Sequence, residues 1–474
     1  MADTRTVVLF PSLGVGHLNP MLELAAVCIR HGLAVTIAVP DPATTAPAFS
    51  ATLRKYASRL PSLSVHSLPP PPPAADAAAA AAAHPILRML AVLRAHAPAL
   101  RALLRGAHAL VADMFSVYAL DAAAEAGVPG YILFCTGAAN LAVFLRLPQF
   151  CSGSGGESLR DLGDAPVSFP GVRPIPASYL PEEVLDRGTD LSAAVLDAFG
   201  RMADGRGILT NTFEALEGSA VAALRDARDT PPVYCVGPLI ASGAEEEEEE
   251  RQHPCLAWLD AQPERSVVFL CFGSRGALSR EQVREMATGI ENSGQRFLWV
   301  LRAPAGETEA AALLPDGFVS RTADRGMVVT ASWVPQVAVL QHASTGAFVT
   351  HCGWNSTLEA VAAGVPMVCW PLDAEQWMNK VFIVEEMKVG IEVRGYEPGV
   401  LVEADIVDTT LRRIMESEAR QGVLERVMAA KESAAVAWKE GGSSCAAFAE
   451  FLKNMEEENV AMAHSSQVPT LGSS

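Results

Sequence analysis

Short apolar runs alternate with amphipathic stretches along most of the chain. The first residues show the pattern: VVLF at 7–10, the glycine loop PSLGVGH at 11–17, apolar positions at helical spacing over 18–32, and LAVTIAV at 33–39. A strand, a crossover helix and a second strand in this order predict a βαβ unit with parallel strands.

The same alternation continues in two blocks. Further apolar runs predict buried strands at 109–112, 131–135, 207–210, 267–272, 296–301, 327–330, 346–350 and 365–370, and a helix is expected from Arg280 to Asn292. We therefore expect an α/β protein with two facing doubly wound parallel-sheet domains. Such folds bind ligands at the carboxyl ends of their strands, so the cleft between the domains is the expected ligand site.

A run of six glutamates, Glu245 to Glu250, marks the boundary between the two blocks. Like charges repel and cannot pack, so we expect 241–256 to be a linker between an N-terminal domain at 1–240 and a C-terminal domain at 257–440.

Two segments of low complexity are expected outside the packed cores. Five prolines at 69–73 lead into an alanine-rich run that ends at Ala83, which predicts an exposed excursion of the first domain. The small and polar tail at 461–474 is expected to fray.

Composition and charge narrow the function. Of the 474 residues, 50% are hydrophobic and 19% charged, which excludes wholesale disorder. The net charge of −18 disfavours a general nucleic-acid or anionic-membrane binder, because the mean field repels phosphates. Any phosphate ligand must be held locally, without a net positive charge.

The cysteines and the apolar runs bear on the compartment. The nine cysteines are scattered and never spaced as C-x-x-C, which favours buried or idle thiols over a disulfide framework or a zinc cluster. The apolar part of MADTRTVVLF is short for a secretory signal, and no apolar run approaches the ~20 residues of a membrane span. We expect a cytoplasmic protein without stable membrane insertion.

The densest group of polar and aromatic residues lies between Trp333 and Gln376. At its centre, FVTHCGWNSTLEAVAAG predicts a strand, a tight turn at Gly353 and a helix whose first amides fall near Asn355 and Ser356. Unpaired amides and the helix dipole form an anion site, and the His351 and Ser356 side chains add donors without positive charge. Asn355 or Ser356 could instead only cap the helix, and Gly353 could only turn the chain.

His17 and Asp113 form a second candidate pair. Each follows a predicted strand, and the carboxyl ends of parallel strands share one edge of a sheet, so the two can meet although 96 residues separate them. A histidine held by a carboxylate is a tuned general base. The alternative is that His17 packs near Gly16 and Asp113 caps a helix.

The segment from Trp333 to Gln376 resembles the 44-residue signature box of plant family 1 UDP-glycosyltransferases, and it has that length here. Other pieces similar to the family are GVGHLNP, NTFEALE at 211–217, YCVGP at 234–238, LDAQPERSVVFLCFGS at 259–274 and GGSS at 441–444. The resemblance implies the GT-B fold, with an acceptor-binding N-terminal domain, a donor-binding C-terminal domain and a final helix, about 441–457, that packs back on the first domain.

The resemblance also implies roles for single residues. Trp333 would stack on uracil, the Val334 backbone would read the base edge, and Gln336 and Glu359 would bind the ribose. The residues implied at the pyrophosphate are Ser274, His351, Asn355 and Ser356, with the turn at Gly353. The residues implied at the sugar are Trp354, Glu375, Gln376 and, from the first domain, Thr136. The matching positions of the base and its orienting carboxylate are His17 and Asp113.

The family usually has Asp where this chain has Glu375, so the sugar contact differs by one methylene. A closing Gln, with Trp354 inside the box, goes with UDP-glucose in relatives, whereas a closing His is associated with UDP-galactose. We expect glucose as the first choice and keep galactose as the second.

Other classes of protein compete with this interpretation. GVGHLN approaches the dinucleotide fingerprint of an NAD(P)-dependent oxidoreductase, with Asp41 near the place of a ribose-binding acid, but the third glycine is absent. A catalytically silent nucleotide-sugar binding protein is a second alternative, although it would have little reason to retain both His17 and Asp113.

The resemblance thus implies an inverting transferase that moves a hexose from a UDP-sugar to a hydroxyl of a small lipophilic phenolic, such as a flavonoid or anthocyanidin. Transferases that hold Mn²⁺ or Mg²⁺ on the pyrophosphate use a D-x-D motif, and the chain contains none. We therefore expect no metal and no cofactor besides the UDP-sugar co-substrate, and we expect a monomer.

Overall fold

The structure, a computed structural model, describes residues 5–40, 45–71, 83–153, 158–241, 252–274, 276–304, 309–330 and 334–465. Most of the proline- and alanine-rich run, most of the acidic linker, Trp333 and the last nine residues lie outside these ranges, so the predictions made for them stay predictions. The chain forms two compact units. Unit 1 comprises Met1–Ser178, Glu182–Ile240 and Ala437–Ser474, and unit 2 comprises Tyr179–Pro181 and Ala241–Val436.

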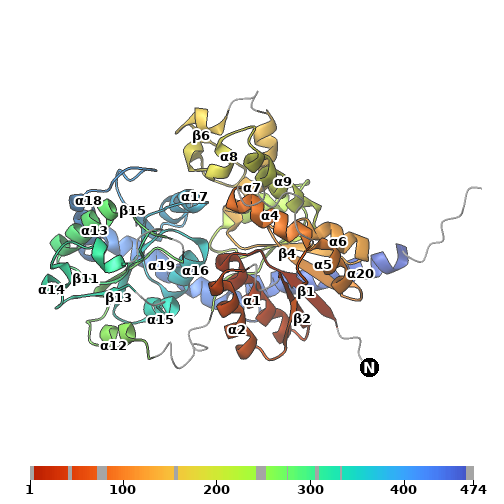
Figure 1. The fold of residues 1–474 in the computed structure, drawn as a ribbon, viewed down its shortest axis with the longest axis horizontal. Coiled ribbons are helices and arrows are strands. Elements are labelled where there is room, and N and C mark those ends of the chain that lie inside the picture. The colour runs from red at the N-terminus through yellow and green to blue at the C-terminus, as the bar shows by residue number, and fades with distance from the viewer. Residues whose placement is uncertain are drawn as a thin grey trace, which may run out of the picture. The chain divides into compact units, whose positions relative to one another are not determined.

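Unit 1 is built on a parallel sheet of seven strands in the order β3-β2-β1-β4-β5-β8-β9. Figure 1 labels β1, β2 and β4 of this sheet. Its strands are β1 (Thr6–Phe10), β2 (Ala34–Val39), β3 (Leu63–Ser67), β4 (Ala109–Asp113), β5 (Gly130–Phe134), β8 (Ile208–Thr210) and β9 (Val233–Cys235). Its helices are α1 (Val15–Arg30), α2 (Pro47–Arg59), α4 (Pro85–Ala95), α5 (Ala97–Leu104), α6 (Ala119–Ala126), α7 (Ala138–Gly153), α8 (Glu182–Leu185), α9 (Asp190–Arg201), α10 (Gly218–Asp226) and α20 (Ser443–Ser465). A small antiparallel pair, β6 (Pro166–Val167) and β7 (Ile175–Pro176), lies outside this sheet.

Both faces of the central strands β1, β4 and β5 are buried, which explains why these strands are nearly continuous apolar runs. Along β1, Val7 and Leu9 belong to the core cluster that includes residues of α1, α2 and α20, and the alternate residues Val8 and Phe10 are buried as well. Side chains that alternate between faces need helices on both sides.

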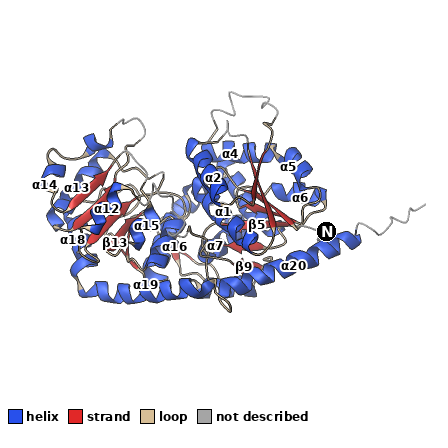
Figure 2. Cartoon of the chain, turned by 90° about the horizontal axis from the view of Figure 1, so that it is seen from below, coloured by secondary structure: helices blue, strands red, loops and turns tan. Residues whose placement is uncertain are grey.

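Helix α20 returns from the end of the chain to unit 1 and runs along β9 (Figure 2). Phe451 is fully buried, with its ring 5.0 Å from Tyr131 and 5.7 Å from Tyr234. The Ser444 hydroxyl donates to the carbonyl of Gly237, and Asn454 Nδ2 donates to the Tyr234 hydroxyl at 2.7 Å. The last helix therefore completes the core of the first unit.

Unit 2 contains a parallel sheet of six strands in the order β12-β11-β10-β13-β14-β15. Its strands are β10 (Val267–Cys271), β11 (Arg296–Val300), β12 (Gly326–Val329), β13 (Thr345–Thr350), β14 (Met367–Cys369) and β15 (Gly390–Glu392). Its helices are α12 (Pro254–Asp260), α13 (Arg280–Ser293), α14 (Phe318–Arg321), α15 (Gln336–Gln341), α16 (Trp354–Ala363), α17 (Gln376–Val381), α18 (Ala404–Glu416) and α19 (Glu418–Ala437).

The sequence-predicted fold class is confirmed by two doubly wound parallel sheets, and the differences lie at element ends. Helix α1 begins at Val15, so His17 lies in its first turn and not in the preceding loop. Helix α12 begins at Pro254, inside the expected linker, because the His253 side chain accepts a hydrogen bond from the Cys255 amide and caps the helix.

The tail was expected to fray from residue 461, and this is wrong for its first residues, because α20 extends to Ser465. The strands β3, β9 and β15 were not predicted as strands. Tyr179–Pro181 belongs by its contacts to unit 2, although these residues lie within the segment expected to form the first domain.

The packing of α20 generates a stability prediction. Phe451→Ala should lower the free energy of unfolding by about 3–5 kcal/mol, since it removes a buried ring and leaves a cavity. Lys453→Ala on the exposed side of the same helix should change it by less than about 0.5 kcal/mol, because the Lys453 side chain is 73% exposed. Urea unfolding measures both, and equal midpoints for the two variants would show that α20 does not stabilise unit 1.

Candidate active site

His17 and Asp113 meet at the point where the strand order of the first sheet reverses. The chain runs from β1 outward to β2 and β3 and then returns to β4 on the other side of β1. Asp113 is the last residue of β4, and His17 follows β1. His17 Nδ1 lies 2.8 Å from Asp113 Oδ2. Parallel pairing of β1 with β4 thus brings together two residues that are far apart in sequence.

The carboxylate of Asp113 is held firmly. It is fully buried, and its second oxygen, Oδ1, accepts a hydrogen bond of 2.9 Å from the Phe115 amide. The His17 side chain is 24% exposed and its ring lies 5.3 Å from that of Phe115. One side of the imidazole is therefore fixed by the protein and part of the ring is open to solvent.

Cys135 is a third member of this group that sequence analysis treated as an idle thiol. Its Sγ lies 3.2 Å from His17 Nδ1. Cys135 follows β5, which pairs in parallel with β4, so it ends at the same sheet edge. The signal was available in the sequence, since Cys135 closes the strand predicted at 131–135, but the cysteines were examined only for paired motifs.

The surroundings of His17 favour its charged form. Burial disfavours the imidazolium, but the charges and hydrogen bonds of Asp113 and Cys135 outweigh burial, and the pKa of His17 is raised well above 6.5. Proton acceptance by this ring therefore needs a higher pH than an exposed histidine would.

Thr136 is buried and already hydrogen bonded. Its hydroxyl accepts from Asn140 Nδ2 at 2.9 Å, and its carbonyl accepts from the Thr210 hydroxyl. Nearby, the Glu217 carboxylate accepts the amides of Ala138 and Ala139 at 2.9 and 3.0 Å, which caps the start of α7. The final Glu of the NTFEALE run is thus structural.

In unit 2 the loop after β13 has the local geometry that the sequence predicts, a tight turn followed directly by a helix start. Cys352 has φ of 65°, Gly353 is the N-cap, and α16 starts at Trp354. The early amides of the helix include those of Asn355 and Ser356. Ser356 is 7% exposed and Trp354 3% exposed. This helix start follows β13 at the reversal of strand order in the second sheet, as α1 follows β1 in the first.

His351 is seated between two glycines. A Cβ at Gly273 would lie 2.7 Å from the imidazole, and one at Gly353 would lie 2.4 Å from it. Burial lowers the pKa of His351 to about 4 against the raising effect of Asp373. Its buried Nδ1 has no hydrogen-bond partner among the described residues. The ring is therefore neutral at pH 7. Ser274, next to Gly273, is exposed.

Gln336, Ser356 and Glu359 form one hydrogen-bonded group. Gln336 Nε2 lies 2.9 Å from Ser356 Oγ and 2.6 Å from Glu359 Oε2. Burial raises the pKa of Glu359 to about 7, although the hydrogen bond from Gln336 opposes the rise. Val334 precedes this group and is 3% exposed. The residues implied at the ribose are thus together, and Trp333 lies outside the described residues.

The Gln376 side chain is hydrogen bonded to the loop before α17. Its Oε1 accepts the amides of Leu372 and Asp373 at 2.9 and 3.1 Å, and its Nε2 donates to Asp373 Oδ1 at 2.5 Å. Glu375 is half-buried, and its Oε1 lies 3.5 Å from Asn379 Nδ2. Asn379 also donates to the Cys352 carbonyl at 2.9 Å, which links α17 to the turn before α16.

Sequence analysis missed the group that fastens α17 from the other side. The buried ammonium of Lys380 donates to the Tyr179 hydroxyl at 2.8 Å, and that hydroxyl donates to Glu397 at 2.7 Å. The Tyr179 ring lies 5.2 Å from that of Trp377. These partners are about two hundred residues apart in sequence, and no local pattern connects them.

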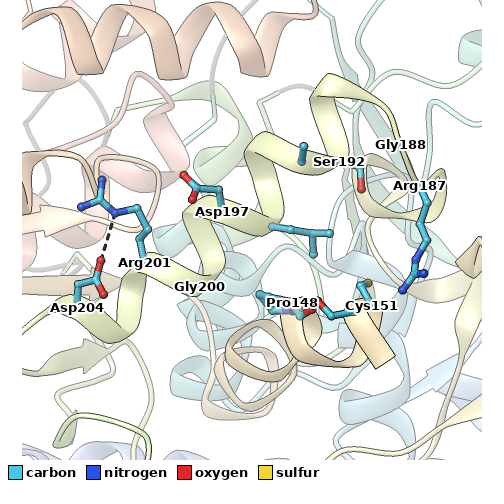
Figure 3. Close-up of a pocket in the computed structure, with 12 residues that line it drawn as sticks. Pro148, Cys151, Arg187, Gly188, Ser192, Asp197, Gly200, Arg201 and Asp204 are labelled. Atoms are coloured by element: carbon cyan, nitrogen blue, oxygen red, sulfur yellow. Dashed lines mark hydrogen bonds and ion pairs between the residues drawn. The ribbon is translucent and has the colours of Figure 1, made fainter. Parts of the chain in front are cut away.

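A cavity of about 550 Å³ lies elsewhere in unit 1. Pro148 and Cys151 of α7 face Ser192 and Asp197 of α9 across it, with Arg187 at one end and the Arg201–Asp204 ion pair at the other (Figure 3). None of the residues predicted from the sequence to bind or react lines this cavity.

No helix in the described ranges is both long and apolar enough to cross a bilayer.

Comparison with known proteins connects this geometry to a family. A family model described as UDP-glucoronosyl and UDP-glucosyl transferase matches residues 228–418. Anthocyanidin 5,3-O-glucosyltransferase of a Rosa hybrid cultivar is 39% identical over 477 residues, which cover 94% of this chain and 98% of that protein. Isoflavone 7-O-glucosyltransferase 1 of Glycine max is 38% identical over 480 residues, with shares of 94% and 98%.

Solved structures agree with the sequence relatives. UGT2 of Phytolacca americana, complexed with UDP-2-fluoro-glucose and pterostilbene, has a TM-score of 0.86 and 34% identity, and covers 96% of this chain and 100% of its own. A UDP-glucosyltransferase from Polygonum tinctorium capable of glucosylating indoxyl has a TM-score of 0.87 and 36% identity over the same shares. The chain therefore belongs to the plant UDP-glycosyltransferase family and is an enzyme with the GT-B fold.

Proposed function

We propose that the protein transfers glucose from UDP-glucose to a hydroxyl of a flavonoid-type phenolic, with inversion at the anomeric carbon and without a metal ion. The observation that carries the proposal is the 2.8 Å contact between His17 and the buried Asp113. The acceptor class is supported by relatives named as anthocyanidin, isoflavone and phloretin glucosyltransferases.

In this reaction His17 is the general base. Asp113 holds Nδ1–H, which leaves Nε2 to take the proton of the acceptor hydroxyl as its oxygen attacks the anomeric carbon. The bond from that carbon to the diphosphate oxygen breaks at the same time, and UDP leaves. Attack opposite the leaving group inverts the configuration.

Unit 2 would hold the donor. Glu359, aligned by Gln336, would accept hydrogen bonds from the ribose diol, and the amides at the start of α16 would bind the diphosphate. The neutral His351, and Ser356 and Ser274, add donors without the cost of burying a positive charge. These groups would stabilise the leaving diphosphate in place of a metal ion.

A silent nucleotide-sugar binding protein would need the unit 2 site alone. It would not need a base oriented by a fully buried carboxylate, so the His17–Asp113 pair favours catalysis. An oxidoreductase is not favoured, because the relatives and the solved structures are glycosyltransferases.

The first prediction of the mechanism concerns the base. His17→Ala should reduce transfer on the order of 10²-fold or more while leaving UDP affinity nearly unchanged, because the nucleotide groups lie in unit 2. His31→Ala, which changes an exposed histidine at the other end of α1, is the matched control and should keep normal activity. Near-normal turnover of a weakly acidic alcohol by His17→Ala would contradict the assignment.

The same pair sets the pH dependence. Because Asp113 raises the pKa of His17, kcat/KM should rise with pH through a pKa well above 6.5. Asp113→Asn removes that charge while burial still disfavours the imidazolium, so the acid limb should move to lower pH, and the plateau should fall because the ring loses its orientation. An unmoved acid limb would show that His17 does not titrate in catalysis.

The second prediction concerns the diphosphate. EDTA should leave activity unchanged, and His351→Ala should weaken UDP and UDP-glucose to the same extent, since both contain the diphosphate. The control is His342→Ala. His342 is another histidine of unit 2, hydrogen bonded to Ser344 and Asp260, and its variant should bind UDP and UDP-glucose normally. Calorimetry measures the affinities. Activity lost in EDTA and restored by Mg²⁺ or Mn²⁺ would overturn the metal-free mechanism.

The third prediction concerns the sugar. With equimolar UDP-glucose and UDP-galactose, glucoside should exceed galactoside about 5- to 150-fold, because the donors differ at one hydroxyl and an unpaired polar group costs roughly 1–3 kcal/mol. Since Gln376 is occupied by its own loop, Glu375→Asp should change this ratio. Chromatography of the two glycosides measures it, and an excess of galactoside would refute the donor assignment.

A further inference from the structure

Three metal-ligating atoms from separate segments converge at the edge of the first sheet. They are His17 Nδ1, Asp113 Oδ2 and Cys135 Sγ, and all lie within 4.8 Å of one another. Nδ1 is 2.8 Å from the carboxylate oxygen and 3.2 Å from the sulfur. We call His17, Asp113 and Cys135 the edge triad.

We propose that the edge triad is an inhibitory binding site for a divalent cation of the Zn²⁺ type, which blocks transfer by occupying Nδ1 of His17. An imidazole nitrogen, a carboxylate oxygen and a thiolate sulfur are the three ligand types that Zn²⁺ uses in proteins. Mg²⁺ and Ca²⁺ select oxygen ligands and should not bind here.

The distances fit a metal site after a small adjustment. Metal–ligand bonds of about 2.0–2.3 Å at tetrahedral angles separate ligand atoms by roughly 3.3–3.6 Å. The two separations from Nδ1 are shorter by about half an ångström or less, so the His17 ring need only move slightly outward to open them, and the carboxylate oxygen and the sulfur lie within 4.8 Å of each other. The His17 side chain is 24% exposed whereas Asp113 and Cys135 are buried, so an ion would enter along the His17 ring and take its fourth ligand from the solvent.

The surrounding protein already holds two of the three ligand atoms in place. Asp113 is fully buried, and its second oxygen is fixed by the Phe115 amide, so the coordinating oxygen is already aimed at the histidine. Cys135 is 5% exposed and follows a strand paired with β4. Little conformational freedom remains to be lost when an ion binds.

Binding must release protons. Coordination needs an unprotonated Nδ1 and a thiolate Sγ, so each proton that either atom carries in the free protein passes to the solvent. The site then holds a neutral imidazole, two anionic ligands and one dication. The displaced protons keep the charge balanced.

The inhibitory effect rests on the function proposed above for His17. With the ion on Nδ1, the neutral imidazole carries its remaining proton on Nε2. That nitrogen then has no lone pair with which to take the proton of an acceptor hydroxyl. The ion also removes the Asp113 hydrogen bond that orients the ring. A bound metal therefore inactivates the base without touching the donor groups of unit 2.

Binding is tested on the full chain without an activity assay. Co²⁺ is the probe, because a thiolate ligand gives a charge-transfer absorption band, and proton release is followed in weakly buffered solution. We expect one tight site with the thiolate band, lost in Cys135→Ser. Cys255→Ser is the matched control, since Cys255 Sγ lies 2.9 Å from His253 Nδ1, a second cysteine–histidine contact. Absence of the band, or its loss in Cys255→Ser only, would overturn the proposal.

Inhibition is tested by titrating Zn²⁺ into the transfer reaction and comparing each variant with its own metal-free rate. We expect inhibition that EDTA reverses and that Mg²⁺ does not reproduce. Cys135→Ser should need at least about 10- to 100-fold more Zn²⁺, since losing a direct ligand costs no less than losing an outer-shell partner, and Cys255→Ser should need no more. Co²⁺ and Zn²⁺ binding at the triad without inhibition would refute the blocking step and the base assignment together. Inhibition without the thiolate band would refute the site and leave the base assignment intact.

Discussion

Parallel pairing of the first strand of each sheet with a strand from later in the chain is the constraint on which the site residues depend. In unit 1, β1 pairs with β4, and the strand order reverses between them. In unit 2, β10 pairs with β13 at the equivalent reversal. At such a reversal the two neighbouring crossovers lie on opposite faces, so the loops at the carboxyl ends separate and leave room for ligand groups. His17 and Asp113 lie at the first reversal, and Gly273 and His351 lie at the second.

The histidines at the two sheet edges, His17 and His351, have pKa values shifted in opposite directions. At the first, the fully buried Asp113 carboxylate raises the pKa of His17 and so favours the protonated form of the ring. At the second, burial outweighs the raising effect of Asp373, lowers the pKa of His351 to about 4 and keeps the ring neutral. Under the proposed function, a chain with a net charge of −18 would in this way offer a base and a diphosphate site without a cluster of basic side chains.

Residues that do not react themselves hold the candidate site residues in position through close contacts. Two glycines leave space for the His351 ring, Gln376 ties down the loop before α17, and the Lys380–Tyr179 contact holds that helix from its other side. Helix α20 stabilises the first sheet as a whole, because its aromatic residues pack on one face of that sheet. Packed interiors transmit displacements, so these positions matter for the geometry of the site although they lack reactive groups.

The sequence by itself determined the two parallel sheets, most strand positions, the family and the pairing of His17 with Asp113, because apolar periodicity and sheet-edge logic are local signals that combine by simple rules. It also located the start of α16 after β13. Only the tertiary structure decided that Cys135 joins the dyad, that Gln376 is engaged by its own loop, and that Tyr179–Pro181 belongs with unit 2. These features depend on side-chain direction and on contacts between segments up to two hundred residues apart. Such contacts arise from packing and leave no periodic pattern in the chain.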